Sequence, residues 1–150
     1  MPIENDNTAE SYVAFRERAL RHREQSSAGD VHEDMKQLYE FWSHFLCRNF
    51  NPKMYNEFRK YALEDAEQSA RTGTNELIKY YDVVLQSRKK TIHDTFAKHY
   101  VELVKNEDRA TQRPGFTNLR AAWRNGSLDL KSRKKIDNLL DAKLKEELER

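Results

Sequence analysis

The sequence is poor in cysteine, proline and glycine. Its 150 residues include one Cys, three Pro and four Gly. The single cysteine, Cys47, excludes a disulfide within the chain and is typical of a reducing compartment. Few Pro and Gly residues, in a chain that is 35% charged, favour helices with solvated outer faces over a fold of strands and tight turns.

The sequence also lacks long apolar segments and a large net charge of either sign. The longest apolar runs are far shorter than the roughly 20 residues that span a membrane, so we expect no membrane segment and a cytoplasmic protein. The 27 basic and 25 acidic residues nearly cancel, so any attraction to nucleic acid has to be local. Disorder is opposed by two Trp, seven Tyr and seven Phe, whose rings supply apolar area for a core.

Apolar residues recur at helical spacing, and local start and stop signals separate the segments. Asp30, three residues before Glu33, predicts a capping box at the start of a helix. Asn51-Pro52 predicts the start of the next helix, with Asn as the N-cap. Gly73 predicts the end of that helix, and Thr74 the start of the one after it.

Two sets of apolar residues repeat with a period of about forty residues. The first set is Phe15, Phe58 and Phe96, followed four residues later by Ala19, Ala62 and Tyr100. The second set is Leu38, Leu77 and Leu119, followed three and four residues later by Phe41-Trp42, Tyr80-Tyr81 and Ala122-Trp123. This period predicts an all-α fold of HEAT-like helical repeats, a short α-solenoid; unrelated helices in a bundle are the alternative.

The repeat predicts the following organisation. Residues 1–10 form a flexible tail, and residues 11–150 form one helical-repeat domain. Three helix pairs occupy about 11–48, 51–88 and 90–125, and a capping helix occupies about 130–149. The aromatic residues around Asn51-Pro52 are expected to form the core between two repeats: Phe41, Trp42, Phe45, Phe50, Tyr55 and Phe58.

Residues in a catalytic or metal-binding pattern are not apparent. His93 and His99 are six positions apart and do not share a helical face, and His22, His32 and His44 have no acidic or Cys partner at ligand spacing. A lone Cys47 is more often a packing or surface residue than a nucleophile. We therefore expect no enzyme, no metal and no cofactor.

Basic residues do cluster. The clusters are Arg16, Arg18, Arg21 and Arg23; Arg88-Lys89-Lys90; and Arg133-Lys134-Lys135. Such clusters attract phosphates if they face one groove. They are also the ordinary charge of helix surfaces and helix ends, and this simpler interpretation is favoured when the clusters are taken alone.

A longer pattern connects these segments to a known family. It reads Phe41-Trp42-Ser43-His44-Phe45-Leu46, Phe50-Asn51-Pro52-Lys53-Met54-Tyr55, Glu57-Phe58, Ala62-Leu63-Glu64-Asp65-Ala66, Gly73 and Tyr80-Tyr81. The pattern resembles the C-terminal tandem-repeat region of the La-related protein 1 family, translation regulators of mRNAs with a cap followed by a pyrimidine tract (TOP mRNAs). The resemblance is strong over roughly 36–86, fair over 12–35 and weak beyond about 105.

The resemblance implies a HEAT-like fold whose second helices line a groove for the 7-methylguanosine cap and the first cytidine. In such a site two aromatic rings sandwich the methylated guanine, a carboxylate accepts from its Watson–Crick edge, and arginines bind the triphosphate. The family's ligand-facing positions in the first two repeats fall here on Glu40, His44, Cys47, Lys79, Val83 and Gln86.

These residues depart from the family's pattern. Lys79 keeps the positive charge of the family's arginine but cannot form the bidentate hydrogen bonds of a guanidinium group. Val83 stands at the aromatic clamp, Gln86 stands at the carboxylate, and the second clamp tyrosine has no counterpart after Trp123. Because base–aromatic stacking contributes roughly 1–3 kcal/mol per base, we expect any preference for capped RNA to be weak.

Two functions follow from the sequence. The first is RNA binding at mRNA 5′ ends by a monomeric module in translation regulation. Its expected contact residues are His44, Lys79, Gln86, Glu40, Arg48, Arg120, Arg124, Arg88, Lys89 and Lys90. The second is a protein-interaction scaffold that keeps the fold without cap binding, with translation factors or other regions of the same protein as partners.

Overall fold

A computed structural model describes residues 11–27, 29–87 and 90–150. It contains eight α-helices and no strand within these residues. The chain divides into two compact units, 1–80 and 81–150, and the division falls within helix α4 (Thr72–Leu85). The predicted tail, 1–10, lies outside the described residues.

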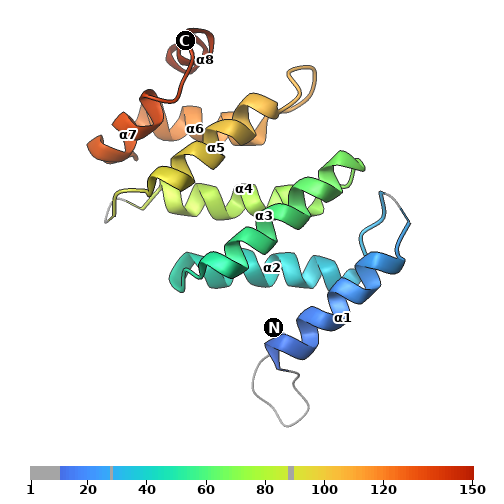
Figure 1. Ribbon diagram of the computed structural model, residues 1–150. Helices are drawn as coiled ribbons and strands as arrows, with labels where there is room; N and C mark the ends of the chain where they lie inside the picture. The colour runs from blue at the N-terminus through green and yellow to red at the C-terminus, as the bar shows by residue number, and fades with distance from the viewer. Residues whose placement is uncertain (1–10, 28, 88–89) are drawn as a thin grey trace. The chain divides into compact units, whose positions relative to one another are not determined.

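The first unit contains α1 (Tyr12–Gln25), α2 (Glu33–Arg48), α3 (Pro52–Glu67) and most of α4, drawn from blue to green in Figure 1. The prediction for the start of α3 is correct: Asn51 is the N-cap, Pro52 begins the helix, and the Asn51 side chain accepts from the Met54 N–H at 3.1 Å. The capping box at Asp30 was wrong. The N-cap of α2 is His32, whose Nδ1 accepts from the Asp34 N–H at 3.0 Å.

Aromatic side chains form the core of this unit. Phe15, Tyr39, Trp42 and Phe58 are fully buried, and the Trp42 and Phe58 rings lie 5.7 Å apart. Burying one such side chain contributes roughly 1.5–3 kcal/mol, so this cluster supplies much of the unit's stability. The indole N–H of Trp42 donates to the Tyr12 hydroxyl at 2.9 Å, which satisfies the polar atom of a buried ring.

Gly73 has a different role from the predicted one. Helix α3 ends at Glu67, and Gly73 lies in the first turn of α4. A Cβ added there would lie 2.8 Å from the Ala62 Cα and 2.8 Å from the Tyr39 Cζ. Glycine is needed at this position because α4 approaches the backbone of α3 too closely for a side chain.

Three polar side chains connect the helices of the first unit. The Tyr39 hydroxyl of α2 donates to Asp65 of α3. Arg23 of α1 forms an ion pair with the same carboxylate, with 3.0 Å between the Arg23 Nη2 and Asp65 Oδ1. Burial raises the pKa of Tyr39 far above its ordinary value, so its hydroxyl stays protonated and remains a donor.

The second unit begins within α4 and continues with α5 (Asp94–Asn106), α6 (Pro114–Asn125), α7 (Leu130–Asp137) and α8 (Ala142–Glu149). Tyr81 packs edge-on against Phe96, with ring centroids 5.0 Å apart. The buried Tyr100 hydroxyl donates to the Gly115 carbonyl at 2.6 Å. Glu107 accepts from the N–H groups of Gly115 and Phe116, so its carboxylate caps the start of α6.

The C-terminal segment differs from the single helix predicted over about 130–149. It forms two helices, α7 and α8, with a turn over 138–141. Asp141 causes the restart, because its side chain accepts from the Leu144 N–H at 2.7 Å and caps α8. The apolar stripe is shared between the two helices, since Ile136 of α7 and Leu144 and Leu148 of α8 are all buried.

The predicted all-α fold of HEAT-like helix pairs is confirmed, and the residues of both repeating sets are buried. Phe50 was wrongly expected in the core, because its side chain is 54% exposed between α2 and α3. Among the described residues, none of the helices is both long enough and apolar enough to cross a membrane.

Candidate nucleic-acid interface

The first group of predicted contact residues lies on one face of α2. Glu40, His44 and Arg48 are exposed and follow one another at intervals of four residues, which places them one turn apart. His44 Nδ1 lies 2.9 Å from the Glu40 carbonyl oxygen. A ring donating through Nδ1 would keep Nε2 and the ring face directed to solvent, available for stacking.

Cys47 lies beside this face and is half-buried. Its thiol donates to the Ser43 carbonyl at 3.1 Å. Burial raises the pKa of the Cys47 thiol, and the nearby charge of Arg48 opposes this only in part. A raised pKa disfavours the thiolate, so the environment of Cys47 does not favour a nucleophile.

Lys79, in the first unit, is exposed and forms an ion pair with Glu76, with 3.0 Å between Nζ and Oε2. Its positive charge is therefore partly neutralised. Gln86, in the second unit, is exposed and its side-chain amide donates to Asp82 at 3.4 Å. Val83, where the resemblance implies a clamping ring, is 55% exposed and presents an aliphatic surface.

Arg88 and Lys89 lie outside the described residues, and Lys90 is exposed just before α5. Of the predicted basic run Arg88-Lys89-Lys90, the structure therefore describes only Lys90.

Arg120 and Arg124, one turn apart on α6, converge on a single oxygen. The Arg120 Nη2 and Arg124 Nη1 donate to the Arg150 carbonyl at 3.0 and 2.8 Å. The two guanidinium groups therefore lie within about 6 Å of each other. Within the described part of the chain, no Asp or Glu side chain forms an ion pair with either arginine, and the oxygen that they share belongs to the last residue of the sequence.

Several other arginines have acidic partners. Arg16 pairs with Glu57, Arg18 with Asp34, Arg23 with Glu64 and Asp65, and Arg109 and Arg113 with Glu147. Their charges are compensated within the fold, and the predicted cluster around Arg16–Arg23 is largely structural. The pair on α6 is different, because its two positive charges lie close together and, among the described residues, have no Asp or Glu side chain as a partner.

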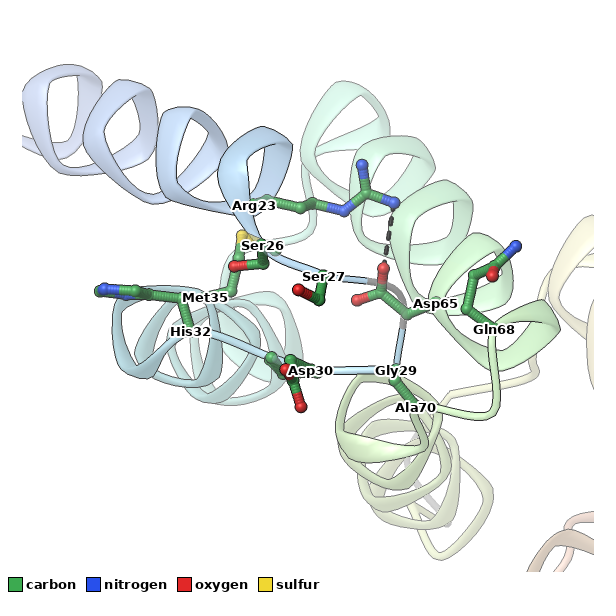
Figure 2. Close-up of a pocket in the computed structure, with 11 residues that line it drawn as sticks. Arg23, Ser26, Ser27, Gly29, Asp30, His32, Met35, Asp65, Gln68 and Ala70 are labelled. Carbon is green, nitrogen blue, oxygen red and sulfur yellow. Dashed lines mark ion pairs between the residues drawn. The ribbon is translucent and has the colours of Figure 1, made fainter.

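A cavity of about 160 Å³ in the first unit was not predicted from the sequence. Figure 2 shows it between the loop after α1 and the end of α3, with Arg23 reaching toward Asp65. Its lining is mostly polar and includes two carboxylates, Asp30 and Asp65, beside the one arginine. This charge balance disfavours the phosphate of a nucleic acid.

A contact between His22 and the carboxylate of Asp34 was not predicted from the sequence. The His22 Nδ1 lies 2.7 Å from the Asp34 Oδ2, and the His22 and His32 rings lie 4.0 Å apart. The statement that these histidines lack an acidic partner was therefore wrong. The signal was available, because His22 lies in the last turn of α1 and Asp34 in the first turn of α2, and a short loop brings such helix ends together.

The helix pairs and their buried Leu and aromatic sets define a HEAT-like helical-repeat protein. The family model of the LARP1 HEAT repeat region matches residues 2–146, and the chain belongs to this family. The resemblance inferred from the sequence is thereby confirmed, and the match extends well beyond the segment in which the pattern was strongest.

Proposed function

We propose that the chain is an RNA-binding repeat module of a La-related protein. Membership of the LARP1 HEAT repeat family supports this function at the level of the family. The observation in this chain that carries the proposal is the pair Arg120 and Arg124, whose guanidinium groups converge on one oxygen and have no Asp or Glu side chain as a partner among the described residues. Two such groups at this separation suit the phosphates of a single strand.

The residues on α2 supply a second kind of contact in the proposal. His44 offers an exposed ring for stacking, and Arg48 offers an exposed cation one turn away. Lys79 should contribute less to RNA binding than an unpaired lysine would, because its ion pair with Glu76 partly neutralises its positive charge.

The proposed ligand is the 5′ end of mRNA in the cytoplasm, with a role in translation regulation. We propose that binding depends little on the cap. Val83 supports this part of the proposal, because an exposed aliphatic side chain cannot stack on a methylated guanine as an aromatic ring does.

The test is the binding of fluorescent pyrimidine-rich oligonucleotides, capped and uncapped, measured by anisotropy over a series of salt concentrations. The wild-type chain should bind both RNAs with similar affinity, and binding should weaken as salt rises. The double variant Arg120→Ala/Arg124→Ala should lower the salt slope by about 1.4, because each lost phosphate contact on a single strand removes about 0.7.

Lys98→Ala is the matched control, because it removes an exposed cation from α5 and leaves α6 intact. Absence of RNA binding, or a double variant with the wild-type salt slope, would overturn the proposal. A large preference for capped RNA would contradict only the part that concerns the cap.

The second candidate is a protein-interaction scaffold. Leu130 favours it, because this leucine is 84% exposed at the first position of α7. An exposed aliphatic side chain does not bind RNA phosphates. Capture of partners from lysate with and without nuclease separates the two functions. Partners that survive RNA digestion and are lost in Leu130→Ser support the scaffold.

A further inference from the structure

Three side chains with metal-ligating atoms meet between the end of α1 and the start of α2: His22, His32 and Asp34. One ligand atom from each lies within 4.8 Å of those of the other two. The Asp34 Oδ2 is 2.7 Å from the His22 Nδ1 and 3.9 Å from the His32 Nδ1. The proposed RNA contacts use none of these residues.

We propose that these three residues bind a divalent transition-metal ion, with Zn²⁺ the ion that the ligands suit best. Two imidazole nitrogens and one carboxylate oxygen are ordinary zinc ligands, whereas Mg²⁺ and Ca²⁺ prefer oxygen alone. At zinc–ligand distances of about 2.0–2.2 Å, the ligand atoms of a tetrahedral site lie roughly 3.3 Å apart. The observed 2.7 Å (His22) and 3.9 Å (His32) from the Asp34 Oδ2 lie on either side of this value. Binding through the His32 Nδ1 would displace the Asp34 N–H that this nitrogen accepts at the N-cap of α2.

The backbone holds the ligands near these positions before the ion arrives. His22 lies in the last turn of α1, His32 is the N-cap of α2, and Asp34 lies in the first turn of α2. All three side chains are partly accessible, so an ion can enter from solvent, and water can supply the fourth ligand. The ion would replace the proton between His22 and Asp34 and join the two helices.

Arg18 opposes the ion. Its Nε lies 3.0 Å from the Asp34 Oδ2, the same oxygen that faces both histidines. A cation at this distance repels a divalent ion, so the wild-type site should bind less tightly than its ligands alone would allow. This makes Arg18 a diagnostic position: removing its charge should strengthen metal binding if the ion lies at Asp34, and should have no such effect if it lies elsewhere.

The experiment is isothermal titration of the full chain, without an affinity tag, with ZnCl₂. Co²⁺ absorption in the visible range reports the coordination geometry. His22→Gln keeps a donor for Asp34, and His32→Asn keeps an N-cap side chain, so both variants should fold. His44→Gln is the matched control, because it removes an imidazole from α2 outside the cluster. Circular dichroism checks that each variant is helical.

We expect one Zn²⁺ per chain, with affinity at least about tenfold lower in His22→Gln and in His32→Asn. Arg18→Met should bind at least about threefold more tightly than wild type, and His44→Gln should match wild type. Zn²⁺ should also raise the thermal midpoint of wild type and not that of the double variant His22→Gln/His32→Asn. Absence of binding by wild type, or equal affinity of wild type and the double variant, overturns the proposal.

Discussion

Replacement of Gly73 by alanine tests the close packing of α3 against α4. In an open helix this change stabilises by about 1 kcal/mol, because alanine is the better helix former. Here the new Cβ would lie 2.8 Å from the Ala62 Cα and the Tyr39 Cζ, well inside the roughly 3.5–4.0 Å of a carbon–carbon contact. Both neighbours are fully buried, and one contact is with backbone, so neither can move freely.

Overpacking of this kind costs about 1–3 kcal/mol, and a backbone contact places this site in the upper half of that range. After the gain in helix propensity, Gly73→Ala should destabilise the fold by about 1–2 kcal/mol. Urea unfolding, followed by circular dichroism and tryptophan fluorescence, measures the change. Asn75→Ala, at an exposed position of the same turn, should be neutral or slightly stabilising. A Gly73→Ala protein that is as stable as wild type would refute the reasoning.

Two further changes test single interactions. Tyr12→Phe leaves the buried indole N–H of Trp42 without its acceptor and should cost about 1–2 kcal/mol, read from the urea midpoint; an unchanged midpoint would show that water replaces the hydroxyl. Hydrogen bonds from Arg109 and Arg113 lower the pKa of Glu147 below its ordinary value near 4.5, so this carboxylate stabilises the fold above that pH, and the stabilisation is lost as the pH falls through the lowered pKa. Glu147→Gln should therefore cost about 1 kcal/mol at pH 7, and the difference from wild type should shrink as the pH is lowered from about 7 to 3; a constant difference would contradict the assignment.

The core residues were predictable because apolar residues recur at regular intervals along the sequence. Leu38, Leu77 and Leu119 recur at nearly constant spacing, and all three are fully buried. The N-cap at Asn51 was predictable for a similar reason, since the cap and the helix that it starts are adjacent in sequence.

What sequence alone could not give depends on distant neighbours. Gly73 looks like a helix end until Ala62 and Tyr39 are placed beside it. Phe50 looks like a core residue by its type, yet it lies between two helices and is exposed. For the candidate interface, the residue types show only which side chains are charged and which carry aromatic rings. They do not show what these side chains contact. Whether an arginine pairs with an acidic side chain, as Arg113 does, or donates to a main-chain oxygen that a second arginine also binds, as Arg120 does, is decided by the packing of helices.

The polar contacts of Tyr39, Asp65 and Arg23 have a consequence for how the first unit comes apart. Apolar side chains can exchange one contact for another when a helix shifts by a turn, whereas these three groups satisfy one another at one relative position of α1, α2 and α3. Loss of α3 would leave the Tyr39 hydroxyl and the Arg23 charge without the Asp65 carboxylate, and loss of α1 or α2 would take away one of the two partners of Asp65. The three helices should therefore open as one cooperative unit, and their most protected amides should exchange with solvent at a common rate.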